Sequence, residues 1–130
     1  HKELALIGEE TGEGTEIQSI TLFKLMKTFE RVMKRMQDRN NKPVHTVVRY
    51  NYTMEGSRDY MLDVVRKEKT MVFEKIFDIC GDRIHAIFLF LSLLELSQQR
   101  FMTILTGEGR NNFIVEWNEN REEEVVAELA

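Results

Sequence analysis

Apolar residues recur with helical spacing in several parts of the chain and alternate with polar residues in others. Between Ser19 and Arg39 they are three or four residues apart, which predicts an amphipathic helix with an apolar row along one side. The row consists of Leu22, Met26, Phe29, Met33 and Met36. We expect Ser19 or Thr21 to cap the start of this helix, and the asparagines before Pro43 to end it.

The next segment predicts a strand followed by a helix. Residues 45–52 (HTVVRYNY) are rich in β-branched and aromatic side chains and alternate in polarity, which is typical of a short strand. Thr53 is then expected to cap a helix that runs to about Lys67. Residues 69–72 predict a short extended link after this helix.

A short helix and a long helix are predicted after this link. Residues 73–80 place four apolar side chains on one face of a short helix, and Gly81 is expected to end it in the left-handed conformation. Asp82 is expected to cap the long helix, which continues to about Arg100. The single cysteine, Cys80, is interpreted as a small buried apolar group.

Two apolar runs around a turn-rich loop predict a β-hairpin. The runs are residues 101–106 (FMTILT) and 112–117 (NFIVEW), with Gly107 and Gly109 between them. Helix, short helix, long helix and hairpin follow one another in the order of a winged helix. We therefore predict a mainly α (α+β) fold, a winged helix-turn-helix domain with a two-stranded wing, preceded by an amphipathic helix.

This interpretation divides the chain into four parts. The first sixteen residues contain three glycines and five glutamates without a period, and the last thirteen contain the run Glu122 to Glu124. The tail is expected to be a frayed helix or disordered. The predicted parts are an acidic flexible linker (1–18), an amphipathic helix (19–41), the winged-helix domain (44–117) and an acidic tail (118–130).

The predicted long helix is apolar on both sides. At 100° per residue, the apolar residues of one side are Ile84, Ile87, Phe88, Leu91 and Leu94. Those of the other side are Ala86, Leu89, Phe90, Leu93 and Leu96. A helix of this kind has to be covered on both sides, so we expect neighbouring helices on one side and the amphipathic helix, the wing or another protein on the other. Glu95 is expected to pair with a basic residue or to reach water.

These apolar residues favour a protein partner over DNA. A helix that reads the major groove presents Arg, Lys, Asn or Gln to the bases, whereas the middle of this helix is Phe and Leu. Leaving about four such side chains in water would forgo roughly 1.5–3 kcal/mol each. The wing is also apolar: alternation places Phe113, Val115 and Trp117 on one face. Ile114 is expected on the other face, where an edge strand could pair with a strand of a partner.

Composition and charge argue against several other functions. The formal net charge is −4, which disfavours a general polyanion-coating protein. The apolar run from Ala86 to Leu94 is shorter than the roughly 20 residues that a bilayer span needs. Cys80, Asp82 and His85 lie close in sequence but lack the paired spacing of a zinc site. No catalytic motif is recognisable, so we expect a non-enzyme without a cofactor or a metal.

Basic residues follow the side of the amphipathic helix opposite its apolar row. They are Lys24, Lys27, Arg31, Lys34 and Arg35. Such a stripe is either a solvated face or a surface that contacts an acidic partner or DNA.

Three segments resemble segregation and condensation protein A, the kleisin family of the bacterial SMC condensin. They are residues 90–96 (FLSLLEL), 72–77 (VFEKIF) and 113–115 (FIV), and the segment HTVVRYNYT also resembles this family. The chain departs from the family pattern at Ser92, where Ala is usual, and at residues 112–114, where Gly-Asp-Ile is usual. The similarity covers about residues 19–117 and corresponds to the C-terminal half of that family.

The resemblance implies a non-catalytic adaptor in chromosome condensation and segregation, located in the cytoplasm at the nucleoid. Its implied partners are an SMC ATPase head, a dimer of segregation and condensation protein B near residues 1–39, and DNA indirectly through the complex, with no membrane. The implied head-contacting residues are Phe90, Leu93, Leu96, Ile114 and Trp117. Two alternatives remain open, a winged-helix transcription regulator that binds DNA and a domain that self-associates through the apolar row of residues 19–39.

Overall fold

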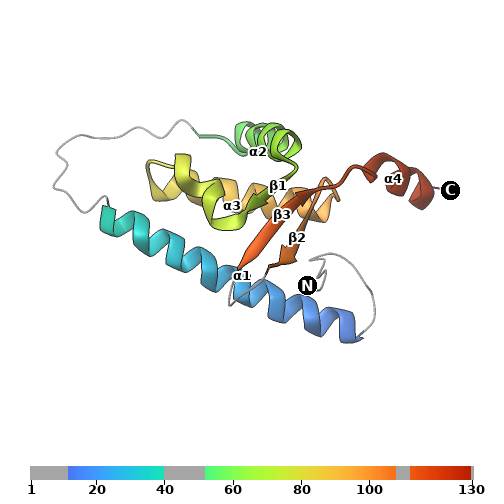
Figure 1. Ribbon diagram of the computed structural model, residues 1–130, viewed down its shortest axis with the longest axis horizontal. Helices are drawn as coiled ribbons and strands as arrows, with labels where there is room; N and C mark the ends of the chain where they lie inside the picture. Colours follow the sequence, from blue (N-terminus) through green and yellow to red (C-terminus); the bar gives the residue numbers. More distant parts are fainter. Residues whose placement is uncertain (1–11, 40–51, 108–111, 130) are drawn as a thin grey trace.

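The chain forms a helical winged-helix domain with a small antiparallel sheet (Figure 1). The computed structural model describes residues 12–39, 52–107 and 112–129. Residues 45–51 of the strand predicted at 45–52 therefore lie outside the described residues, and Tyr52 is not in a strand. The elements are α1 (Gly12–Arg39), α2 (Met54–Glu68), β1 (Thr70–Val72), the 3₁₀ helix η1 (Phe73–Ile79), α3 (Arg83–Gln98), β2 (Met102–Thr106), β3 (Phe113–Trp117) and α4 (Arg121–Leu129). From α2 to β3 this is the winged-helix order, and the predicted α+β class is confirmed.

The long helix α1 differs from the prediction in its start and in its buried side. It begins at Gly12, inside the segment predicted to be a linker, because each residue added to an existing helix gains a hydrogen bond without repeating the cost of nucleation. Between residues 21 and 36, its buried side chains are Thr21, Leu25, Thr28, Val32 and Met36. Of the predicted row, only Met36 is fully buried, Phe29 and Met33 are partly buried, and Leu22 and Met26 are exposed.

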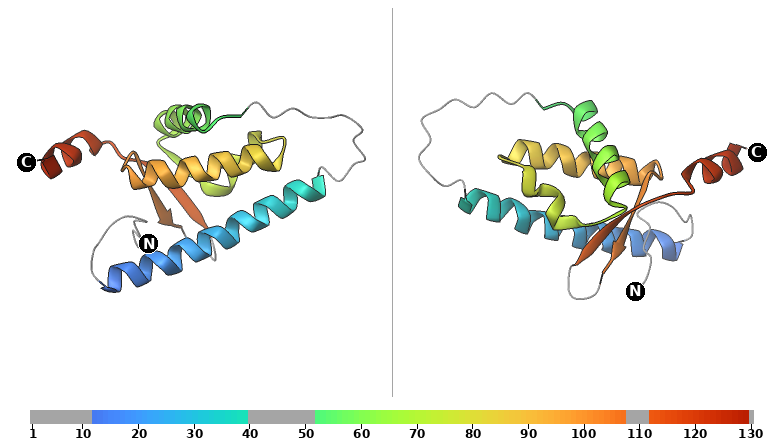
Figure 2. Two further views of the ribbon diagram at one scale, coloured as in Figure 1. Left: turned by 180° about the vertical axis from the view of Figure 1, so that it is seen from behind. Right: turned by 45° about the horizontal axis from the view of Figure 1, so that its top comes forward.

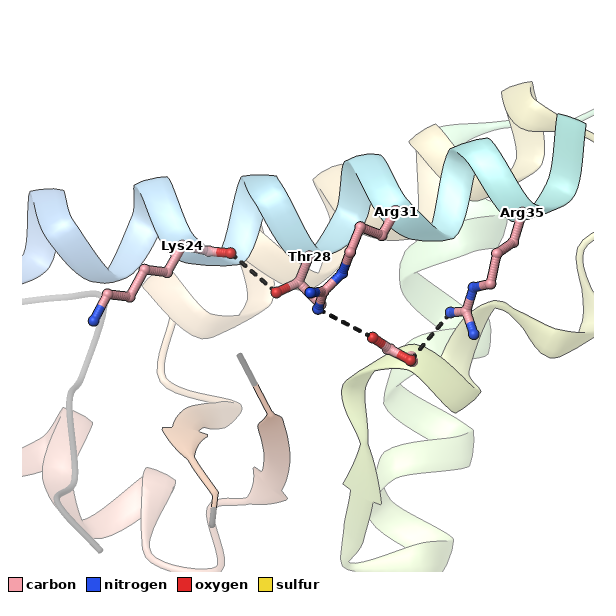
Figure 3. A network of polar contacts seen from close by, with 5 residues as sticks. Lys24, Thr28, Arg31 and Arg35 are labelled. Atoms are coloured by element: carbon pink, nitrogen blue, oxygen red, sulfur yellow. Dashed lines mark hydrogen bonds and ion pairs between the residues drawn. The ribbon is translucent and has the colours of Figure 1, made fainter. Parts of the chain in front are cut away.

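The two threonines explain this error. The Thr28 hydroxyl donates to the backbone carbonyl oxygen of Lys24 at 3.0 Å (Figure 3), so its polar group is satisfied inside its own helix. A polar residue satisfied in this way can occupy the buried side of α1. A row drawn through apolar residues alone is therefore rotated away from the true contact side.

Predicted caps begin α2 and α3. The Thr53 side chain accepts from the backbone N–H of Gly56 at 2.9 Å, and Asp82 Oδ1 accepts from that of His85 at 2.9 Å. The predicted left-handed Gly81 is wrong, because η1 ends at Ile79 with an extended Cys80 and the φ of Gly81 is not positive. The chain leaves η1 in an extended conformation, which any residue can adopt.

The sheet has three strands in the order β1-β3-β2, and both pairings are antiparallel. The predicted hairpin of β2 and β3 is confirmed, with Ile104 opposite Val115. The predicted link before η1 is a strand as well, and pairs Val72 with Ile114. Because β3 is the central strand, Ile114 does not lie on an edge, and the predicted pairing of its strand with a partner strand is wrong.

The core lies where α3 meets α1, α2, η1 and the sheet. Phe73 packs against Phe77 and Phe113 at centroid distances of 5.1 and 6.3 Å, and Phe29 of α1 stacks on Phe90 at 4.3 Å. Edge-to-face and stacked rings of this kind add to the stabilisation from buried area. In Figure 2, seen from behind, α3 runs between α2 and α1. One predicted apolar side of α3 is therefore covered within the chain, whereas Ile84, Ile87 and Leu91 on the other side stay partly exposed.

The acidic tail contains a helix, α4, that is attached to the base of the wing by its own polar groups. Arg121 Nε donates to the backbone oxygen of Gln99 at 3.0 Å, and its guanidinium lies 3.6 Å from the centroid of the Phe101 ring. Glu128 forms an ion pair with Arg100. None of the described residues of α4 is fully buried.

Candidate protein-interaction surface

The outer face of α3 carries a row of exposed apolar side chains. Ile84 and Ile87 are each 37% exposed, and Leu91 is 45% exposed. Spacings of three and four residues place them on one side of the helix, and the exposed Gln98 continues the row two turns further on. We call Ile84, Ile87 and Leu91 the α3 row.

Predicted contact residues on α3 lie on the opposite side of the helix. Phe90, Leu93 and Leu96 are buried in the core. The burial of these three side chains stabilises the domain, and they present almost no surface to a partner while the domain is folded. The α3 row, in contrast, is accessible to a partner.

The two predicted contact residues of the wing are partly exposed. Ile114 lies on the outer face of the sheet, opposite Val72 and Leu105 in the two neighbouring strands. Trp117 ends β3 and packs near Phe101, with ring centroids 6.4 Å apart. A contact between these residues and a partner stays a prediction.

The helices α2 and α1 flank α3. On one flank, Arg58 of α2 donates to Glu95 at 3.2 Å, which confirms that Glu95 pairs with a basic residue. On the other flank, Phe29 holds α1 against α3. Exposed Leu22 and Met26 lie seven and three residues before Phe29, on the same side of α1. Leu22 and Met26 therefore extend the apolar side of α1 beyond its contact with α3.

The predicted basic stripe is exposed along α1, but part of it has an internal role. Figure 3 shows Arg31 and Arg35 converging on one carboxylate, that of Glu74 in η1, at 3.5 and 3.1 Å. Lys27 lies 3.6 Å from Glu30 of the same helix. Lys24 and Lys34 are exposed. The two arginines therefore attach α1 to η1, and contact of the stripe with DNA stays a prediction.

The polar groups near the start of α3 have structural roles. Asp82 is a helix cap, and the His85 ring stacks on Tyr52 with centroids 4.1 Å apart. Burial lowers the pKa of His85, and the Asp82 charge opposes this effect. Cys80 is buried, as predicted. Nowhere in the described ranges do three His, Cys, Asp or Glu side chains converge as metal ligands would.

The α3 row provides an apolar contact area for another protein. Fully burying the α3 row against a partner would contribute about 2–4 kcal/mol, since each side chain is already more than half buried. The sequence contained one sign of which side was free: Gln98, a polar residue, is in register with the α3 row, whereas the opposite side includes the small Ala86. Within the described segments, no helix is long and apolar enough to cross a bilayer.

Comparisons with known proteins agree with the resemblance seen in the motifs. The chain is 24% identical over 103 residues to segregation and condensation protein A of Clostridium acetobutylicum, which covers 77% of this chain and 41% of the relative. It is 22% identical over 110 residues to the proteins of that name from Clostridium botulinum strains Eklund 17B and Alaska E43, covering 82% of this chain and 44% of each. The resemblance is thereby confirmed.

The matched region accounts for less than half of each relative, so the chain spans about two fifths of the length of the curated proteins that it matches. No protein-family model matches the chain, and no solved structure gives a significant match.

Proposed function

We propose that this chain is a non-catalytic kleisin-type subunit that supports chromosome condensation and segregation, and that its α3 row docks on an SMC ATPase head. The observation that carries the proposal is the row itself. At the position where a DNA-reading winged helix presents polar and cationic side chains, α3 presents Ile84, Ile87 and Leu91. The similarity to three proteins named segregation and condensation protein A supports the same assignment.

In this proposal the chain contributes surface and the SMC partner hydrolyses ATP. The second proposed partner is a dimer of segregation and condensation protein B, near residues 1–39, and DNA is reached through the assembled complex at the nucleoid. The α3 row is flanked by a partly exposed ion pair, Arg58 with Glu95. An apolar centre with a charged rim is the usual arrangement of a protein–protein interface.

A pull-down with a purified SMC head tests the proposal. Leu91→Glu places a charge in the middle of the α3 row while keeping a residue that favours helix. We expect this variant to lose the head and to retain the circular dichroism spectrum of the wild type. Val126→Glu in α4 is the matched control, because it adds the same charge at another exposed apolar position, and it should retain the head.

Two results would contradict the proposal. One is a Leu91→Glu variant that is folded and still binds the head as the wild type does. The other is a wild-type chain that ignores the head but shifts a DNA duplex with a steep salt dependence, which is the behaviour of a winged-helix DNA-binding regulator.

A further inference from the structure

The inner and outer sides of α4 have different surroundings. The inner side is used within the chain: Arg121 contacts Gln99 and Phe101, Glu128 pairs with Arg100, and Asn118 donates to Glu124 at 2.7 Å. The outer side consists of Glu122, Glu123, Val126 and Leu129, which share one face at spacings of three and four residues. Val126 is 64% exposed and Leu129 is 83% exposed.

An amphipathic surface of opposite charge lies on the outer face of α1. There Phe23, 60% exposed, and Met26 form an apolar pair, and the Lys27 ammonium lies 5.4 Å from the centroid of the Phe23 ring. Lys34 lies on the same face two turns on. Glu30 also lies there, and its charge is balanced by Lys27 at 3.6 Å.

We propose that the outer side of α4 packs on the outer face of α1 of a second copy of this chain. In an antiparallel arrangement Leu129 meets Phe23 and Val126 meets Met26. The glutamates at the start of α4 then lie opposite Glu30, about one turn from Lys27 on one side and from Lys34 on the other. The parallel arrangement would instead place a glutamate on Phe23.

Charge complementarity selects a second copy as the occupant. The four glutamates and one arginine of α4 give a net charge of −3. Residues 21–36 of α1 hold five basic residues and one acidic residue, Glu30, a net charge of +4, and the Glu74 carboxylate, which Arg31 and Arg35 share within the chain, lowers this to +3. Figure 1 shows α4 beyond the end of the sheet, apart from α1 of its own chain. Each copy therefore carries both contact surfaces, α4 at one place and the outer face of α1 at another. Contact between unlike surfaces of two copies is a head-to-tail interface.

The test is the mass of the 130-residue chain in solution, measured by light scattering and by sedimentation over a wide range of concentrations. We expect the average mass to rise above 15.4 kDa at high concentration and low salt, and to fall as salt screens the charges. Val126→Glu and Phe23→Glu should each remain monomeric when alone. Mixed together, they should form a 1:1 dimer, because one carries an intact α1 face and the other an intact α4.

Each alternative predicts a different result that would overturn the proposal. If α1 pairs with α1, the Val126→Glu variant will still self-associate. If α4 pairs with α4, the Phe23→Glu variant will still self-associate. A wild-type mass of 15.4 kDa at every concentration would show that two copies do not bind each other. A charge swap separates lost contact from lost folding. Glu123→Lys should weaken association about two- to fivefold, and Lys34→Glu in the same chain should restore it.

The self-association and the docking on an SMC head are tested by variants at different residues. The Val126→Glu variant should lose self-association and retain the head, and Leu91→Glu should lose the head and retain self-association. A failure of one proposal therefore leaves the other measurable.

Discussion

Leu91 and Leu93 provide a matched pair that separates the surface of α3 from its core. They are the same residue type in the same helix, two positions apart, so truncation to alanine changes helix propensity equally. Leu91 is 45% exposed, whereas Leu93 is 0% exposed and belongs to the core. Any difference between the two variants therefore reports packing.

We expect Leu93→Ala to lower the free energy of unfolding by about 3 kcal/mol, within the roughly 2–5 kcal/mol found for leucine in close-packed cores. Leu91→Ala removes methyl groups of which about half the surface is already in water, so we expect a loss of about 1 kcal/mol or less. Because a whole domain is stable by only about 5–15 kcal/mol, a difference of about 2 kcal/mol is readily measured.

Urea unfolding followed by circular dichroism is the assay. The midpoint should fall by about 1 M or more for Leu93→Ala and by much less for Leu91→Ala, with the slope unchanged in both. Equal losses in the two variants would refute the assignment of the two sides of α3, and so would a Leu93→Ala variant as stable as the wild type. An unchanged slope is needed, since a changed slope indicates an altered denatured state rather than lost packing.

Three further predictions concern polar contacts. Asp82→Ala removes the acceptor for the His85 N–H and should cost about 1 kcal/mol in urea unfolding, whereas Asp82→Asn should keep most of the stability. Because burial lowers the pKa of His85, the unfolded chain binds the proton more readily, and the stability should fall as the pH drops below 6.5. His85→Gln should flatten this part of the pH profile of stability, and identical profiles for the variant and the wild type would contradict the prediction. Glu74→Gln weakens the contact with Arg31 and Arg35 and should lower the free energy of unfolding by less than about 1 kcal/mol. Amide hydrogen exchange should become faster in α1 than in α3, and equal acceleration in both helices would show that α1 does not open on its own.

For α3, the sequence predicted the helix, its cap and the need for cover on two sides, but not which side faces the core. With apolar residues all round, the pattern has no preferred direction, so Leu89 and Leu93 cannot be distinguished from Ile87 and Leu91 by hydrophobicity. The choice depends on where α1 and α2 pack, and that is tertiary information. The predicted contact residues fell on the core side for this reason.

For α1 and the sheet, the missing information was local. Thr28 is buried because its hydroxyl bonds to its own helix, a possibility that a count of apolar residues does not include. The strand β1 is three residues long, and its identity depends on its pairing with β3, more than forty positions later. The helix α4 has no fully buried residue among those described, and it depends on contacts at the base of the wing, such as that of Arg121 with Phe101.

The strand order has a consequence for synthesis on the ribosome. The middle strand, β3, is the last of the three to be translated, and β1 and β2 have no ladder with each other. In a nascent chain that has emerged only as far as β2, neither β1 nor β2 therefore has a strand with which to pair. The domain can close only after Trp117 has left the ribosome, and a message truncated before Phe113 would yield helices without a sheet.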